Sequence, residues 1–145
     1  MKKILLVAPP FIPVSKNSLA GIEQITYSLG KSLVEQGNDV FTVAREESEV
    51  YGNLVEGWFS SAKSFQGAES EYFHQAMAYE SSIVRNFIRE NQDLDYIIDR
   101  CEGMVLPIAH EENGPLVISA LDLESKFYLH PHIFARLRNA CSTIG

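Results

Sequence analysis

The residues with the clearest chemical potential are a glycine and a carboxylate that stand where a helix is expected to begin. Ala20-Gly21-Ile22-Glu23 follows an apolar run and a loop that contains three prolines. A helix N-terminus presents unpaired backbone N–H groups and the positive end of the helix dipole, which suit a phosphate. Gly21 would let such a ligand approach the backbone closely. Alternatively, Ser18 caps the helix and Glu23 merely favours its first turn; the length of the loop slightly favours a functional role.

A second glycine-containing stretch, Leu29-Gly30-Lys31-Ser32, resembles the end of a P-loop but fails its spacing. The P-loop pattern needs a glycine five residues before Gly30, where this sequence has Ile25. The stretch also lies inside the expected helix rather than at its start. We therefore expect Gly30 to pack the helix on a sheet beside a solvated Lys31. The first strand-to-helix loop also has no GxGxxG dinucleotide fingerprint.

The histidines and cysteines form no pattern that is typical of a metal site or a disulfide framework. His130 and His132 could be two metal ligands, but a surface loop before a helix is the better interpretation because no strong third ligand is evident. Cys101 and Cys141 are far apart and form no CxxC motif, so we expect no disulfide. For Cys101, a structural thiol is favoured over a nucleophile. No metal site is predicted.

The totals of the chain describe one soluble, acidic domain. It has 145 residues, of which 46% are hydrophobic and 21% charged, and its formal net charge is -7. Nucleic-acid surfaces need clustered lysines and arginines, so this balance argues against a nucleic-acid partner. The apolar run near the N-terminus is too short for a signal peptide or a membrane span and is better explained as a buried strand. We expect a cytoplasmic location.

Hydrophobic periodicity predicts alternating strands and helices. Ile22, Ile25, Leu29 and Leu33 recur at helical spacing, and Gly37 follows as a helix C-terminal glycine. A second apolar face at helical spacing comprises Phe73, Ala76, Met77, Ile83, Val84, Phe87 and Ile88. The expected strands are 3–8, 39–44, 53–59, 95–99 and 114–122; the expected helices are 22–36, 69–90, a short one around Pro107, and 131–138.

This alternation predicts the α/β class: a Rossmann-like open, mostly parallel sheet with helices on both faces. Ligands of such sheets bind beyond the carboxyl ends of the strands, near the point where the strand order reverses. The loops after strands 3–8, 95–99 and 114–122 are therefore the places where we expect a site.

Residues 1–44 resemble the N-terminal end of the retaining GT-B glycosyltransferases of the family 4 type. The features in common are the first strand, the proline-containing loop, Ala20-Gly21-Ile22-Glu23, and a helix that ends near Gly37 before a second strand. The stretches DLDYIID and GPLVISALDLES resemble later strands of the same domain. The resemblance implies that residues 1–145 are one acceptor-side, Rossmann-like domain that is incomplete at its C-terminus and lacks the second domain.

The resemblance also implies a function, namely transfer of a sugar from a nucleoside diphosphate sugar to a sugar or lipid-linked acceptor, without a further cofactor. Ala20, Gly21 and Glu23 would bind substrate or phosphate, and Arg100 and Asp122 are the candidates for catalytic residues. For Asp122, a helix cap or turn is an equal alternative. The missing C-terminal domain or a partner chain would complete the enzyme, so this chain alone is expected to be inactive. A lipid-linked acceptor would bring peripheral contact with the inner face of the membrane.

Three departures from the family pattern support an alternative function. Ala20 replaces the first of two glycines, Leu121 stands where many members have a histidine, and Asp99-Arg100 stands at another such position. These changes favour a non-catalytic Rossmann-like binding or interaction domain that works with a partner chain or as a homodimer. A third interpretation is an unrelated flavodoxin-like or nucleotide-binding domain, against which the absent phosphate fingerprints count.

Overall fold

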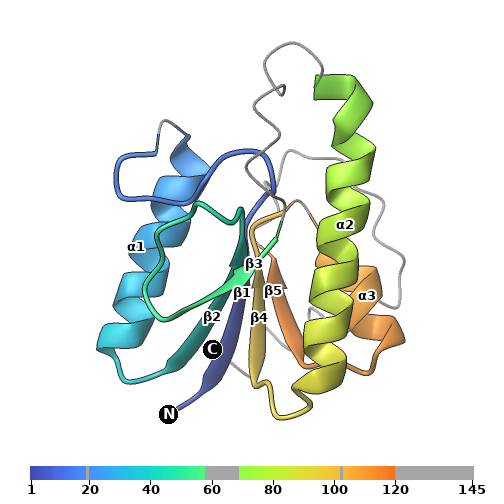
Figure 1. Ribbon diagram of the computed structural model, residues 1–145. Helices are drawn as coiled ribbons and strands as arrows, with labels where there is room; N and C mark the ends of the chain where they lie inside the picture. Colours follow the sequence, from blue (N-terminus) through green and yellow to red (C-terminus); the bar gives the residue numbers. More distant parts are fainter. Residues whose placement is uncertain (19, 58–68, 102, 120–145) are drawn as a thin grey trace.

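Five parallel strands form one open sheet in the computed structural model, which describes residues 1–18, 20–57, 69–101 and 103–119 (Figure 1). The strand order is β3-β2-β1-β4-β5, and every neighbouring pair is parallel. This confirms the predicted α/β class. The strands are β1 (Lys3–Val7), β2 (Asp39–Ala44), β3 (Asn53–Glu56), β4 (Tyr96–Asp99) and β5 (Leu116–Ser119); the helices are α1 (Gly21–Glu35), α2 (Glu69–Glu90) and α3 (Val105–Glu111).

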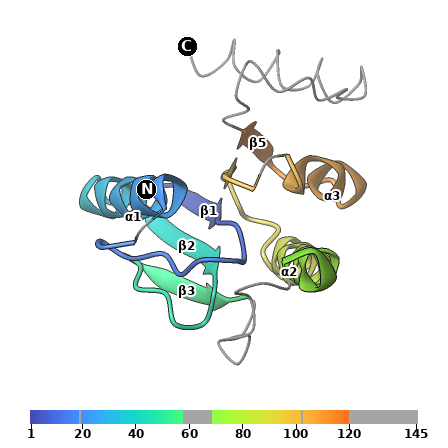
Figure 2. The ribbon, with the colours of Figure 1, turned by 90° about the horizontal axis from the view of Figure 1, so that it is seen from above.

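The helices cover the two faces of the sheet unequally. Helix α1 lies on one face, and α2 and α3 lie on the other (Figures 1 and 2). Alternate residues of β1 point to opposite faces, so Leu5 and Val7 pack with α2 and α3, whereas Ile4 and Leu6 pack on the α1 side. Burial on both faces explains why β1 is a continuous apolar run. The order reverses between β1 and β4, which makes their carboxyl ends the topological switch point.

Most of the predicted elements are found; β1 ends at Val7 and β4 begins at Tyr96, each one residue short of the prediction, and two other strands differ more. Strand β3 ends at Glu56 instead of residue 59, and β5 begins at Leu116 instead of residue 114. Helix α2 has the predicted bounds. Pro107 is the third residue of α3. A backbone N–H at this position would have no intrahelical acceptor, so proline removes no helix hydrogen bond there. The predicted helix 131–138 lies outside the described residues.

The buried face of α1 differs from the predicted one. Ile22 and Ile25 are 39% and 54% exposed, whereas Glu23, Thr26 and Gly30 are buried. The physical reason is that the first turns of α1 lie beyond the end of the sheet, beside the loop that follows β1. Apolar packing against the sheet begins further along the helix, with Leu29, Leu33 and Val34.

Gly30 packs α1 against the sheet, as predicted, and Lys31 beside it is exposed. A methyl group added at Gly30 would lie 3.5 Å from Leu6 Cδ1, an ordinary contact. Because alanine favours a helix over glycine by about 1 kcal/mol, Gly30→Ala should raise the free energy of unfolding by up to that amount. Gly30→Leu should lower it, since there is no room for a larger side chain. Urea denaturation of both variants tests this. If Gly30→Ala lowered the free energy of unfolding, α1 and the sheet would be packed too closely at Gly30 to admit a methyl group.

The connection between β2 and β3 is short for parallel strands, because residues 45–52 contain no helix. The connection packs on the α1 side, where Val50 joins Tyr27 in a small cluster with Ala8, Val14, Ala44 and Leu54. The rings of Tyr27 and Tyr51 make an edge-to-face contact with centroids 5.4 Å apart. This connection therefore lies next to the loop after β1.

Candidate functional site at the carboxyl edge of the sheet

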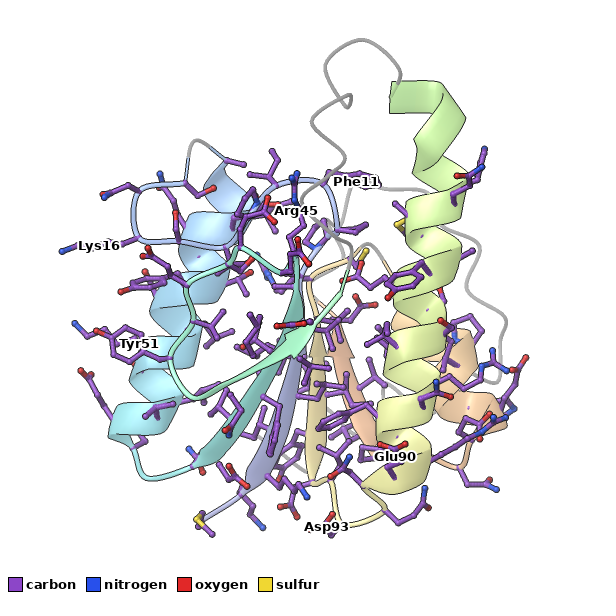
Figure 3. The ribbon with its side chains drawn as sticks, viewed as in Figure 1. Phe11, Lys16, Arg45, Tyr51, Glu90 and Asp93 are labelled. Carbon is purple, nitrogen blue, oxygen red and sulfur yellow. The ribbon has the colours of Figure 1, made fainter. Side chains whose placement is uncertain are left out.

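The loop after β1 is fixed to the loop after β2. Val14 is buried; its N–H donates to Ser48 Oγ at 2.9 Å, and its carbonyl accepts from the Glu49 N–H at 2.8 Å. Arg45, which directly follows β2, donates from Nη1 to the carbonyl of Phe11 at 2.8 Å. Phe11 and Arg45 lie together at the upper, carboxyl edge of the sheet in Figure 3. The long loop is therefore held in a defined position above β1 and β2.

The N-terminus of α1 has no side-chain cap. Ala20 is the N-cap residue, and it provides no side-chain cap hydrogen bond. The hydroxyl of Ser18 lies 3.5 Å from the Ala20 nitrogen, and the Ser18 carbonyl accepts from the side-chain amide of Gln24. The alternative in which Ser18 caps α1 is therefore wrong. At Gly21, a methyl group would have no atom within 4 Å, so open space adjoins these N–H groups.

Glu23 lies in the first turn of α1 with its carboxyl group turned inward. The residue is 4% exposed, and Oε2 has no hydrogen-bond partner. Burial raises the pKa of the Glu23 carboxyl, and a hydrogen bond to its own backbone N–H opposes this shift. A buried oxygen without a partner is costly, so this atom could accept a hydrogen bond from a ligand.

Asp99 organises the loop that follows β4. It is the last residue of β4 and is buried; Oδ1 accepts from the Cys101 N–H at 2.7 Å, and Oδ2 from the Val105 N–H at 3.2 Å. Burial raises the pKa of Asp99, while the hydrogen bonds from Cys101, Val105 and Gly103 and the charge of Arg100 lower it. The Arg100 N–H donates to the Val7 carbonyl at 2.9 Å, which joins the ends of β4 and β1.

A second buried carboxyl group lies on α2. Glu80 is 0% exposed, and neither of its oxygens has a hydrogen-bond partner. Burial, followed by the charge of Asp99, raises the pKa of Glu80 well above its ordinary value. Burial thus favours the protonated form of Glu80. Cys101 is buried, and its sulfur lies 3.8 Å from Met77 Sδ on α2, which agrees with the structural role expected for this thiol.

Buried side-chain atoms without partners concentrate at this end of the molecule. Within the described residues, Glu23 Oε2, Arg45 Nε and Arg100 Nε are three of the five such atoms, and the other two are the oxygens of Glu80 in the middle of α2. The opposite edge of the sheet, where Figure 3 places Asp93, is different. There Lys3 Nζ donates to Asp93 Oδ1 and Asn91 Oδ1, both at 2.9 Å, and the Lys3 N–H donates to Asp95 at 2.8 Å. Buried polar atoms that lack a hydrogen-bond partner are thus found at the carboxyl edge.

The structure describes four of the five candidate site residues and places them on two elements. Ala20, Gly21 and Glu23 lie at one helix N-terminus, and Arg100 follows the strand on the other side of the switch point. Asp122, His130 and His132 lie outside the described residues. Within the described part of the chain, no three histidine, cysteine or acidic side chains could hold a metal ion. No helix there is long and apolar enough to cross a membrane.

Sequence reasoning missed Arg45 and Glu80. A signal for Glu80 was present, because residues 76, 80, 84 and 88 recur every fourth position and the other three are Ala76, Val84 and Ile88. A glutamate in such an apolar stripe predicts a buried carboxyl group. Arg45 directly follows β2, the strand next to β1, and so belongs to the edge at which we expected a ligand.

The fold and the site define an α/β domain with a Rossmann-like open sheet and a polar carboxyl edge. One similar solved structure is the C-terminal domain of the coenzyme A biosynthesis bifunctional protein CoaBC, with a TM-score of 0.54 and 12% identity over 95% of this chain and 73% of that one. Another is a C-terminal hydrogenase domain from Pyrococcus furiosus, with a TM-score of 0.48 and 18% identity over 83% of this chain and 91% of that one. No protein-family model matches the chain, and no curated protein matches it in sequence.

The glycosyltransferase prediction is wrong. No protein-family model of any kind matches, and the similar structure with a TM-score above 0.5 comes from a coenzyme A biosynthesis protein. Sugar transfer from a nucleoside diphosphate sugar and a role in carbohydrate biosynthesis therefore have no support. The features of residues 1–44 that suggested the family are a buried strand, a loop, a helix closed by Gly37 and a parallel strand. Any βαβ unit needs these features, so they identify the fold and not the reaction.

Proposed function

We propose that this domain binds a small phosphorylated molecule that carries a hydroxyl or amine group near its phosphate. The site is the carboxyl edge of the sheet, between the loops that follow β1 and β4. The observation that carries the proposal is the concentration of buried, unpartnered polar atoms at this edge within the described residues. Native proteins leave few such atoms without a partner, and a missing ligand is one explanation for them.

The free donors at this edge favour an anion. The first N–H groups of α1 have no partner in the helix, and Gly21 leaves the space beside them open. Arg45 and Arg100 follow strands on either side of β1, and each has a buried Nε atom without a partner. The Nη atoms of Arg45 are already engaged by the Phe11 carbonyl and by Glu47, the latter at 2.5 Å. Hydrogen bonds from arginine and from a helix N-terminus to phosphate oxygens are charge-assisted and strong.

The free acceptor at this edge requires a donor on the ligand. Glu23 Oε2 is buried in the first turn of α1 and accepts no hydrogen bond. A bare phosphate dianion would be repelled by this carboxylate. A ligand with a hydroxyl or amine group near its phosphate satisfies Glu23 while its phosphate bonds to the helix N–H groups.

The position of the site agrees with the general behaviour of open parallel sheets. Ligands bind outside the carboxyl ends of the strands, where the order reverses, and here that point lies between β1 and β4. The likeness to the CoaBC domain supports the fold alone and does not select the ligand.

Calorimetric titration with ribose 5-phosphate and with ribose tests the proposal. We expect saturable binding of the phosphorylated sugar, weakening with added salt, and none of ribose. Arg100→Gln should weaken binding by about tenfold to a hundredfold, because it removes a charge-assisted bond worth about 1.5–3 kcal/mol.

Arg89→Gln is the matched control for this titration. Arg89 is exposed and pairs with Glu112 at 2.8 Å, away from the carboxyl edge, so its loss should leave the affinity unchanged. Equal affinities of the two variants, or no binding of ribose 5-phosphate to the unaltered chain, would overturn the proposal.

A further inference from the structure

The connection between β2 and β3, residues 45–52, has no crossover helix. Parallel neighbours are ordinarily joined through about a dozen residues or more, usually including a helix that covers the sheet. Here the loop after β1 takes over part of that covering role, since Val14 is completely buried and packs with Ala44, Val50 and Leu54. The connection and the loop therefore form one packed unit beside the carboxyl ends of β1 and β2.

Hydrogen bonds fix the middle of this loop to the connection. A turn, in which the Ser48 N–H donates to the Arg45 carbonyl at 2.9 Å, presents Ser48 to the loop. Ser48 Oγ accepts from the Val14 N–H at 2.9 Å, and the Glu49 N–H donates to the Val14 carbonyl at 2.8 Å. Arg45 adds a third bond, to the Phe11 carbonyl at 2.8 Å. Both backbone groups of the buried Val14 are thus bonded to the connection.

The same loop is bonded to the start of α1. The Ser18 N–H donates to the Ser15 carbonyl at 3.3 Å, and the Ser18 carbonyl accepts from the side-chain amide of Gln24. Ser18 is buried, and Gln24 is the fourth residue of α1. The loop is therefore held at one side by the β2–β3 connection and at the other by the helix whose N-terminus we expect to hold a phosphate.

We propose that Ser48 is a positioning residue of the ligand site: through Val14 it holds the loop after β1, and with it the N-terminus of α1, in the geometry that binds the phosphate. This inference rests on the proposed function and extends that site to the β2–β3 connection. Ser48 acts through the loop and not by touching the ligand. A loop that is already held in its binding conformation loses less entropy when the ligand binds, which raises the affinity. Ligand binding and the attachment of the loop are therefore linked, and each stabilises the other.

The first experiment measures hydrogen exchange at the Val14 and Glu49 amides of the unaltered chain, without and with ribose 5-phosphate. If detachment of the loop destroys the site, bound ligand must suppress that detachment. At about a hundred times the Kd of the ligand, exchange at both amides should slow by about a hundredfold. The Lys3 N–H, which donates to Asp95 Oδ2 at 2.8 Å at the opposite edge of the sheet, is the internal control and should keep its exchange rate.

The outcomes distinguish this inference from the proposed function. If ribose 5-phosphate binds while the Val14 and Glu49 amides keep their exchange rates, the positioning role alone is overturned. Equal slowing at the Lys3 amide would mean that the ligand suppresses only global unfolding, and this result would also overturn the role. If ribose 5-phosphate does not bind, the proposed function and this inference fail together.

Ser48→Ala tests the residue itself, because it removes the acceptor of the Val14 N–H. Exchange at the Glu49 amide should quicken by about threefold to tenfold, and the affinity for ribose 5-phosphate should fall in proportion to the fraction of detached loop. Ser48→Thr keeps the hydroxyl and should restore both values. The matched control is Asp95→Ala, which removes the acceptor of a backbone N–H at the opposite end of β1 and should change neither. Equal exchange at Glu49 in Ser48→Ala and Asp95→Ala would show that Ser48 does not hold the loop.

Discussion

Gly21→Val should abolish measurable binding of ribose 5-phosphate and leave the stability of the fold almost unchanged. The first residue of α1 is Gly21, and a side chain there would project into open space, with no atom within 4 Å of its first carbon. That space adjoins the N–H groups that we expect to hold the phosphate. Loss of two such bonds, at about 1.5–3 kcal/mol each, corresponds to a hundredfold weakening or more. Calorimetry gives the affinity, and thermal unfolding gives the stability.

The control for Gly21→Val is Ile25→Val, an exposed position one turn further along α1. It should change neither the affinity nor the melting temperature by a significant amount. If Gly21→Val bound ribose 5-phosphate as tightly as Ile25→Val, the N-terminus of α1 would not be the phosphate position. The combination of lost binding and retained stability would indicate that this helix end is open for a ligand.

Gly52→Ala should destabilise the protein by about 3 kcal/mol. Gly52 has φ +85, a conformation that costs an L-residue about 1–2 kcal/mol. An added methyl carbon would also lie 2.5 Å from the Val40 carbonyl oxygen. That oxygen belongs to the backbone of β2 and cannot move aside easily, so steric strain adds to the conformational cost. Urea denaturation measures the change in the free energy of unfolding.

Gly37→Ala separates these two contributions. Gly37 follows α1 with a nearly identical φ of +86, but an added methyl group there would have no atom within 4 Å. We therefore expect a loss of only about 1 kcal/mol, from backbone conformation alone. Equal losses for the two variants would mean that the contact between Gly52 and Val40 does not constrain the short connection between β2 and β3.

The sequence predicted the sheet well because its strands and helices have strong local signals. Strand β1 is an uninterrupted apolar run, α2 has an apolar face at helical spacing, and Gly37 ends α1 as expected. The prediction failed at the first turns of α1, where Ile22 and Ile25 are exposed and Glu23 is buried. Periodicity assumes that the apolar side of a helix faces the sheet along its whole length, and the first turns of α1 lie beyond the sheet.

The candidate site was predictable in part. Its place at the carboxyl ends of β1 and β4 followed from the fold class, and Gly21 and Glu23 were found from their position before a helix. Contacts between residues that are far apart in the sequence were not predictable. Arg45 and Phe11 are 34 positions apart in sequence, and nothing local indicates that the side chain after β2 bonds to the loop after β1. The resemblance to glycosyltransferases misled because it rested on features that position a site without defining its reaction.

The most direct test of the central claim is a titration of the ¹⁵N-labelled chain with ribose 5-phosphate, followed by amide chemical shifts. The account predicts saturable shifts of Gly21, Ile22 and the residues that follow β2 and β4, including Arg45 and Arg100. It predicts no shifts at the opposite edge, where Lys3 Nζ already donates a hydrogen bond to Asp93. Shifts that are absent, that do not saturate, or that centre on Lys3 and Asp93 would contradict a ligand site at the carboxyl edge of the sheet.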